Sequence, residues 1–340
     1  MYQYKCMNQI AQFGLNHFTE DYKQTENMEE ADALLVRSAA LHEVDFPENL
    51  KAIARAGAGV NNIPLTKCAD QGIVVFNTPG ANANAVKELV LASAIMASRN
   101  VFEATAWAQT LKGQEGVTKT IEAAWSLKKE VRRAVSLEQL VAQSDIITIH
   151  VPLSDKTKDT INEEVLAKTK KGAILLNFAR GGLVNNEALK DALKKGIISK
   201  YVVDFPDEEV IGVEGIIAVP HLGASTPESE ENCAKMAAEQ LYDFLQTGNI
   251  KNSVNMPACA LPPHQGERIT FVHQNVPNIV SQITTILAKE NNNITSMNNR
   301  SRDKIAYTMI DLEGTVTPEA VKELEAIPEI VRLRIIKSAY

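Results

Sequence analysis

The sequence predicts an α/β protein with two parallel sheets and a smaller sheet-and-helix unit at its carboxyl end. In the first 250 residues, short apolar segments alternate with amphipathic helical segments, as in parallel sheets. Residues 250–266 contain three prolines and are predicted to form a linker. Residues 267–340 follow a βαββαβ order, which is ferredoxin-like. The expected architecture is therefore a flavodoxin-like domain, a Rossmann-type doubly wound domain and a ferredoxin-like domain.

The individual elements follow from apolar periodicity and from turn residues. Strands are expected at residues 4–10, 33–37, 50–54 and 73–76, and then at 145–151, 173–180, 201–204 and 217–221. Helices are expected at residues 84–112, 136–143, 162–170, 186–195 and 227–247. The final unit is expected to have strands at 268–274, 294–299, 306–311 and 330–336, with helices at 276–289 and 318–327.

Composition excludes several classes of protein. The net charge is −7, which argues against a nucleic-acid-binding surface. The longest apolar runs are far too short for a transmembrane helix, and no signal peptide is visible. The four cysteines (Cys6, Cys68, Cys233 and Cys259) lack the spacing of metal ligands, so we expect reduced thiols, a cytoplasmic protein and no metal site.

Polar residues follow three consecutive predicted strands of the second domain. Arg180 ends the first, the acidic run Asp204–Glu209 ends the second, and His221 ends the third. The carboxyl ends of parallel strands share one edge of the sheet, so these side chains should converge. Arginine can hold a carboxylate in two hydrogen bonds, and a histidine backed by a carboxylate can take a proton from a hydroxyl. Taken singly, each residue is equally compatible with a surface arginine, a turn acid or a histidine buried for packing.

A second group of residues predicts an anion site in the first domain. Arg37 and Arg55 follow two predicted strands, and Arg55 precedes a turn with Gly57 and Gly59. A glycine-flanked turn exposes backbone N–H groups that can hold an oxyanion. We therefore expect the two arginines to bind a carboxylate and a phosphate. The alternative is that the glycines only turn the chain and the arginines lie at the surface.

Motifs within these segments resemble the D-2-hydroxyacid dehydrogenase family, in particular its phosphoglycerate dehydrogenase branch. They are Asn177-Phe-Ala-Arg180-Gly-Gly, Pro220-His221-Leu-Gly-Ala-Ser-Thr, the segment 53–62 and the segment 76–89. The resemblance implies that Arg180, Glu208 and His221 are catalytic. Glu208 is chosen from three neighbouring acids by alignment on Phe205-Pro206, in a stretch one residue shorter than the usual pattern.

The resemblance also implies a set of ligand-binding residues. The NAD-binding residues would be Ala58, Val151, Pro152, Phe178, Ala179, Arg180, Asp204, His221, Gly223 and Ala224. The substrate-binding residues would be Arg37, Ser38, Arg55, Gly57, Gly59 and Asn82. Two boundaries follow: a substrate-binding domain at 1–90 with 227–250, and an NAD-binding domain at 91–226.

One part of the family pattern is missing. The family begins its NAD-binding domain with a strand, a G-x-G-x-x-G turn, a helix and a strand, whereas this sequence passes from Lys119 to Thr120 without them. These are strands 1 and 2 of the order 3-2-1-4-5-6, so the strand at 145–151 would lie roughly 14 Å from its surviving partner, with unpaired backbone groups. Omission from the sequence as given, deliberate shortening and natural loss each account for the gap, and we favour omission.

The unit at residues 267–340, which follows the linker at 251–266, resembles an ACT domain, an amino-acid-sensing module. Its first strand–helix loop, residues 273–278, would bind an amino acid such as L-serine. Asn278 stands where the family usually has glycine, and asparagine tolerates positive φ better than most residues. The simpler alternative is that this unit is a dimerisation module that binds no ligand. We expect an independent unit that pairs with its copy or packs peripherally.

The resemblance therefore implies an NAD-dependent oxidation of 3-phospho-D-glycerate in L-serine biosynthesis, by a homodimer or larger homo-oligomer. Two alternatives remain at this point: another D-2-hydroxyacid dehydrogenase of the glycerate or glyoxylate type, and a non-catalytic amino-acid-sensing homologue if the chain truly lacks the βαβ unit. The residue that would distinguish NAD from NADP follows strand 2, within the missing part.

Overall fold

The computed structural model describes residues 1–98, 101, 134–221 and 225–337. They form two compact units, one of Met1–Asn82 with Pro227–Tyr340 and one of Ala83–Thr226. The boundary falls at Asn82 rather than at the predicted residue 90, because helix α3 (Ala83–Ser98) packs its apolar side on the second unit's sheet. The predicted continuation of this helix to residue 112, and the join at 119–120, lie outside the described residues.

The first unit contains the predicted flavodoxin-like sheet. Its five strands have the order β2-β1-β3-β4-β5 and all pair in parallel. They are β1 (Tyr2–Cys6), β2 (Tyr22–Gln24), β3 (Ala33–Val36), β4 (Ala52–Arg55) and β5 (Val74–Phe76). Strand β2 was not predicted because it is only three residues long and two of them are polar and exposed.

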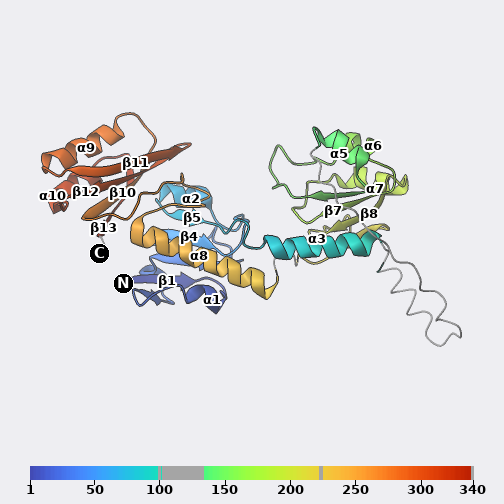
Figure 1. Cartoon of the computed structure of the whole chain (residues 1–340), viewed down its shortest axis with the longest axis horizontal. Helices are drawn as coiled ribbons and strands as arrows, with labels where there is room; N and C mark the ends of the chain where they lie inside the picture. Colours follow the sequence, from blue (N-terminus) through green and yellow to red (C-terminus); the bar gives the residue numbers. More distant parts are fainter. Residues whose placement is uncertain (99–100, 102–133, 222–224, 338–340) are drawn as a thin grey trace. The chain divides into compact units, whose positions relative to one another are not determined.

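Alternate residues of this sheet face two cores. Leu35, Ala54 and Phe76 pack against helix α8 (Pro227–Thr247), whereas Leu34 and Ile53 pack on the opposite side, where α2 (Leu65–Asp70) lies (Figure 1). The remaining short helices are α1 (Gln12–Leu15) and the 3₁₀ turn η1 (Met28–Glu30). Helix α1 lies so close to α8 that a Cβ added to Gly14 would be 2.3 Å from the Ala234 carbonyl carbon.

The second unit contains a four-stranded parallel sheet of order β6-β7-β8-β9. The strands are β6 (Ile146–Ile149), β7 (Ala173–Asn177), β8 (Ile198–Val203) and β9 (Ile216–Ala218). The expectation that the strand at 145–151 would be left without a partner is wrong. Strand β6 is an edge strand that pairs directly with β7 from Ile146–Ile174 to Ile149–Asn177, so the backbone groups that face β7 are paired.

Helices cover both faces of this sheet, as a doubly wound fold requires. Helix α3 lies on the face of Ile174, Leu176 and Val202. On the opposite face lie α5 (Leu137–Gln143), α6 (Glu163–Ala167) and α7 (Asn186–Lys194). The side chain of Ser136 caps α5 by accepting a bond from the Gln139 N–H, which confirms the predicted start of that helix.

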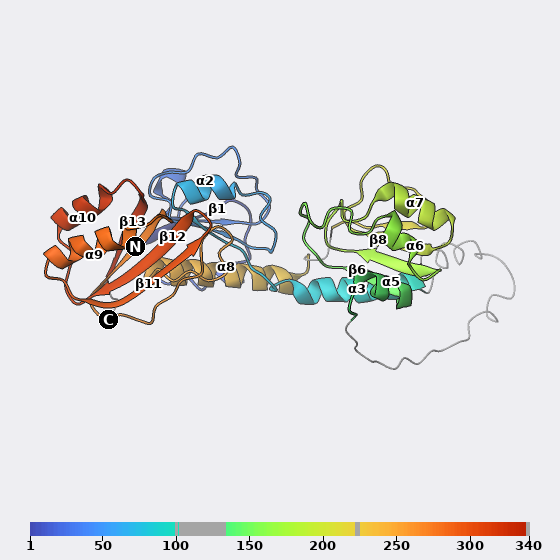
Figure 2. The same ribbon diagram turned by 90° about the horizontal axis from the view of Figure 1, so that it is seen from above.

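The carboxyl-terminal unit has the predicted ferredoxin-like fold. Its antiparallel sheet has the order β11-β12-β10-β13, with both helices on one face (Figure 2). The elements are β10 (Glu267–Gln274), α9 (Ile279–Lys289), β11 (Ile294–Arg302), β12 (Ile305–Leu312), α10 (Pro318–Glu325) and β13 (Ile330–Lys337). Asn278 has φ +70°, which confirms that this position requires left-handed backbone.

This unit is not independent, because its helix-free face shares a core with the first sheet. Val272, Tyr307 and Met309 belong to the same apolar cluster as the residues of α8. Side chains of the ferredoxin-like sheet also donate to carbonyl groups at the end of α8: Arg334 to Leu245, Arg268 to Thr247 and Tyr307 to Gly248, at 2.8–2.9 Å. The predicted linker is ordered as well, since Asn255 bonds to the backbone of β5.

Candidate active site

A histidine and a buried aspartate meet at the carboxyl edge of the second unit's sheet. Asp204 follows the last residue of β8, and His221 lies three residues beyond the end of the neighbouring strand β9. Nδ1 of His221 is 2.9 Å from Oδ2 of Asp204. The aspartate is buried, whereas half of the imidazole is exposed. One nitrogen of the ring is thus fixed and the other faces accessible space.

The carboxylate beside His221 is therefore Asp204 and not the predicted Glu208. Glu208 is exposed in the turn after β8. The neighbouring acids hold this turn against the start of α7, because the Asn186 side chain donates to Asp207 and Glu209 at 2.9 and 3.1 Å. Asp204 follows β8 directly and so lies beside the end of β9, whereas Glu208, the third acid of the run, lies in the exposed turn beyond it.

Burial dominates the electrostatics of Asp204. Loss of water raises the pKa of this carboxyl above its ordinary value, although the His221 hydrogen bond, the His221 charge and Arg180 act in the opposite direction. Its second oxygen, Oδ1, is also buried and has no hydrogen-bond partner among the described residues. An unpaired acceptor of this kind is available to an N–H donor from a bound molecule.

Arg180 lies at the same edge of the sheet and contacts the same aromatic ring as His221. Its guanidinium lies 5.2 Å from the centre of the Phe205 ring, and that ring lies 4.2 Å from the centre of the His221 imidazole. The loop that carries Arg180 is fixed by Asn177, whose side chain donates to the Arg180 carbonyl at 2.9 Å. The predicted convergence of Arg180 and His221 is thus confirmed, and their shared contact with Phe205 was not anticipated, although Phe205 follows Asp204 directly.

The other predicted residues of this unit have mixed positions. Val151 and Pro152 follow β6 and are exposed, Phe178 is buried, and Ala179 is partly buried. Because β6 is paired with β7, all four lie at the same edge as His221. Gly223 and Ala224 lie outside the described residues.

The predicted anion site of the first unit is also assembled at strand ends. Arg37 follows β3 and Arg55 ends the neighbouring β4, and Nε of Arg55 donates to the Arg37 carbonyl at 3.1 Å. The Arg55 guanidinium lies on Gly57, where an added Cβ would be 2.2 Å from Nη1. Gly57 has φ +155° and is buried, whereas Ala58 and Ser38 are exposed, and Gly59 and Asn82 are intermediate. Glycine at 57 therefore suits the turn, and a larger residue there would require the Arg55 guanidinium to move.

Sequence reasoning missed two residues that organise this site. Oδ1 of Asn8 accepts the backbone N–H groups of Arg37, Ser38 and Ala39 at 2.9–3.1 Å and so fixes the loop after β3. Glu230 in the first turns of α8 pairs with Nη2 of Arg37 at 2.7 Å. Neither contact could be inferred from local spacing, because Asn8 and Glu230 lie 29 and 193 residues from Arg37 in the sequence.

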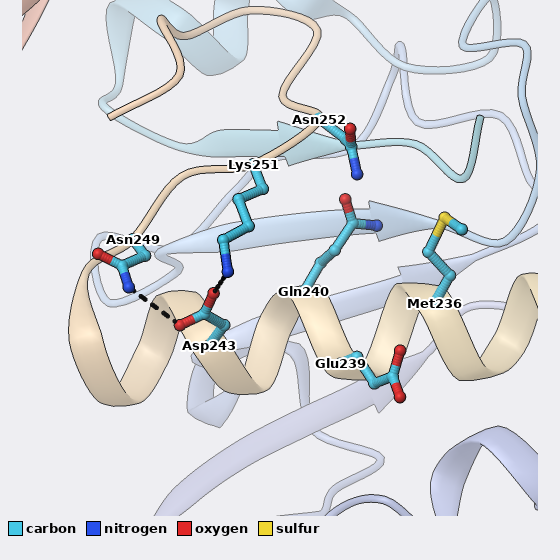
Figure 3. Close-up of a pocket in the computed structure, with 7 residues that line it drawn as sticks. All are labelled: Met236, Glu239, Gln240, Asp243, Asn249, Lys251 and Asn252. Carbon is cyan, nitrogen blue, oxygen red and sulfur yellow. Dashed lines mark hydrogen bonds and ion pairs between the residues drawn. The ribbon is translucent and has the colours of Figure 1, made fainter. Parts of the chain in front are cut away.

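A polar pocket beside α8 holds none of the predicted site residues (Figure 3). Asp243 accepts bonds there from Lys251 at 2.8 Å and from Asn249 at 3.3 Å. The side chain of Gln240 points into the pocket and also donates to the Asn77 carbonyl at 2.9 Å. This pocket is thus linked to the loop after β5, but it carries no part of the His221 site.

Comparison with known proteins identifies the family. Residues 103–266 match the model for the D-isomer specific 2-hydroxyacid dehydrogenase NAD binding domain. A D-3-phosphoglycerate dehydrogenase of Haemophilus influenzae is 30% identical, over 86% of this chain and 83% of that protein. The chain belongs to the D-2-hydroxyacid dehydrogenase family.

Other relatives of this dehydrogenase are consistent with that assignment. A hydroxypyruvate reductase of Thermotoga maritima is 34% identical, over 64% of this chain and 85% of that protein. The structure of an NAD⁺-bound 3-phosphoglycerate dehydrogenase of Entamoeba histolytica has the same fold, with a TM-score of 0.58 and 24% identity over 75% of this chain and 98% of that one.

The comparison also bears on the missing βαβ unit. The Haemophilus alignment is 339 positions long, yet it takes up only 86% of this 340-residue chain. Several tens of its positions therefore have no residue of this chain opposite them, in keeping with the absence of a βαβ unit, which needs at least about 30 residues. No G-x-G-x-x-G occurs in the 340-residue sequence.

The family is an NAD-binding family, and the residues of this dehydrogenase fit the nicotinamide end of that cofactor. The unpaired Oδ1 of Asp204 is suited to accept a bond from a carboxamide N–H. In the described part of the chain, no group of three or more acids, histidines and cysteines could hold a metal ion. No described helix is both long and apolar enough to cross a membrane.

Proposed function

We propose that this dehydrogenase oxidises the 2-hydroxyl of 3-phospho-D-glycerate to 3-phosphohydroxypyruvate with NAD, the first step toward L-serine. The observation that carries the proposal is the Asp204–His221 pair at the carboxyl edge of the sheet, in a chain related to D-3-phosphoglycerate dehydrogenases. Arg37 and Arg55 support a substrate with two anionic ends.

His221 acts as the base in this proposal. Its Nδ1–H donates to Asp204, so Nε2 has the free lone pair that takes the proton of the 2-hydroxyl. Asp204 fixes this tautomer and stabilises the imidazolium that forms. Arg180 holds the C1 carboxylate, and the Phe205 ring contacts the Arg180 guanidinium and the His221 imidazole, which becomes cationic once it has taken the proton.

NAD, when bound, supplies the acceptor for the hydride that leaves C2. Asp204 Oδ1 would hold its carboxamide, and Val151, Pro152, Phe178, Ala179, Gly223, Ala224 and Ala58 are the residues that the family resemblance assigns to its remaining contacts. Glu208 has no part in the proposed site, because Asp204 occupies the position beside His221.

The test is a steady-state assay of NADH formation, on protein of verified intact mass, with 3-phospho-D-glycerate and with D-glycerate. A higher kcat/KM for the phosphorylated acid supports the proposal. A preference for D-glycerate would instead assign the chain to the reductase type of its Thermotoga relative.

A second candidate function is a non-catalytic amino-acid-sensing homologue. The direct pairing of β6 with β7, together with the lack of a G-x-G-x-x-G turn, favours it, because that turn holds the dinucleotide phosphates in this fold. Titration with NAD separates the two functions. Binding in the micromolar range supports the enzyme, and no binding at millimolar NAD supports the sensor.

The ferredoxin-like unit, the oligomeric state and the cellular location complete the proposal. We propose an ACT-like role for the ferredoxin-like unit, with L-serine at residues 273–278, where Asn275, Val276 and Pro277 are exposed. A homodimer and a cytoplasmic location follow from the family resemblance and from the four free thiols. Calorimetry with L-serine and a measurement of mass in solution test the first two.

A further inference from the structure

The Glu230 carboxylate pairs with the guanidinium of Arg37, which the proposed function assigns to an anionic end of the substrate. Its Oε1 lies 2.7 Å from Nη2 of Arg37, and each of the two side chains is 39% exposed. Both residues belong to the same compact unit. Another anion that takes two parallel bonds including Nη2 has to replace the Glu230 carboxylate on that nitrogen.

We propose that Glu230 is a built-in competitor that exchanges with the substrate's phosphate or carboxylate at Arg37. The inference rests on the proposed function, because that function assigns Arg37 to the substrate. The pair is suited to exchange, since both side chains are in contact with water and surface ion pairs contribute little to stability. A phosphate carries more charge than a carboxylate and can take two parallel bonds from the same fork.

The backbone keeps the site in place while the partners change. Three successive N–H groups after β3 are held by Asn8, and the Arg37 carbonyl is held by Nε of Arg55. The released Glu230 stays near the amino end of α8, where a negative charge is favourable. The exchange therefore needs only side-chain rotation.

Two variants of Glu230 separate competition from positioning. Glu230→Gln keeps an amide oxygen that can orient Arg37 but removes the charge, whereas Glu230→Ala removes both. If Glu230 competes, both variants bind an anion more tightly. If Glu230 only orients Arg37, Glu230→Ala binds more weakly and Glu230→Gln does not bind more tightly.

The probe is sulfate, a permanent dianion, titrated by calorimetry into the full chain at low ionic strength. Removal of the competing charge should tighten sulfate binding about two- to fivefold in Glu230→Gln, the range of surface ion pairs. Glu231→Gln, at the adjacent exposed position of the same helix, is the matched control and should bind sulfate like the wild type. Arg37→Met should lose the binding in either background.

Unchanged or weaker sulfate binding in Glu230→Gln overturns the proposal, as does an equal gain in Glu231→Gln. Because the readout is binding and not turnover, it is independent of dehydrogenase activity. Tighter sulfate binding without oxidation of 3-phospho-D-glycerate would leave this proposal standing and reject the proposed function. In an active enzyme, the KM for 3-phospho-D-glycerate should fall in Glu230→Gln by the same factor as the sulfate Kd.

Discussion

Nδ1 of His221 lies 2.9 Å from Oδ2 of Asp204, and the side chain of that aspartate is only 1% exposed. The two residues come from the ends of adjacent parallel strands, so the sheet itself sets their distance. A buried carboxylate that holds one edge of a half-exposed imidazole is the arrangement that a general base needs.

The roles of Asp204 and Glu208 can be separated by substitution. His221→Ala should lower kcat at least ~100-fold, the lower scale of general acid–base catalysis. Asp204→Asn should also lower kcat strongly, by up to ~10⁴-fold, because the imidazole loses the partner that fixes its tautomer. Glu208→Gln, the comparison variant, should cost far less. A larger loss of kcat in Glu208→Gln than in Asp204→Asn would restore the assignment made from sequence.

The same aspartate should reduce stability at neutral pH. Its pKa is raised in the folded state by burial, so the folded protein holds this proton more tightly than the unfolded chain. The protonated carboxyl therefore stabilises the folded state fully below the unfolded pKa of about 3.9, and this stabilisation is lost as pH rises through the folded pKa. Asp204→Asn should raise the Tm at pH 7.5 by roughly 2 °C and lose this advantage toward pH 4. A lower Tm for the variant at pH 7.5 would contradict the sign.

His273 should make the ferredoxin-like unit sensitive to acid. Burial lowers its pKa, and the ring nitrogens lie 2.8 Å from the Gln274 carbonyl and 2.8 Å from the Thr308 hydroxyl. The unfolded chain binds this proton more readily, so stability falls as pH drops below about 6.5, by at most about 1.4 kcal/mol per pH unit. Urea unfolding at pH 7.5 and 5.5 measures the slope. His273→Gln should flatten it, and an unchanged slope would exclude this histidine.

Arg268 and Asp311 form a buried ion pair in the ferredoxin-like unit, where this unit packs against the end of α8. Arg268 is fully buried, with Nε 2.6 Å from Asp311 and Nη1 2.9 Å from the Thr247 carbonyl at the end of α8. Arg268→Met leaves Asp311 as an uncompensated buried charge and should cost about 3–5 kcal/mol. The double variant Arg268→Met with Asp311→Leu should recover much of that loss in denaturant unfolding. Equal instability of the single and double variants would show that packing, not charge, is decisive.

The sequence by itself determined the parallel sheets, the βαββαβ unit and the strand ends that carry Arg180, His221, Arg37 and Arg55. Apolar periodicity and turn residues are local signals, and the carboxyl ends of neighbouring parallel strands necessarily meet. The left-handed backbone at Asn278 was indicated only by the family resemblance, which places a glycine at this position.

Only the tertiary structure decided which carboxylate meets His221, what holds Arg37 and where β6 pairs. Asp204 directly follows β8 and therefore lies at the histidine in place of Glu208, and Glu230 reaches Arg37 from 193 residues away. Strand β6 is paired because unsatisfied backbone groups are costly in a buried sheet, so the strand joins β7 where the family order would leave a gap. These outcomes depend on distances between segments remote in sequence, which local patterns do not encode.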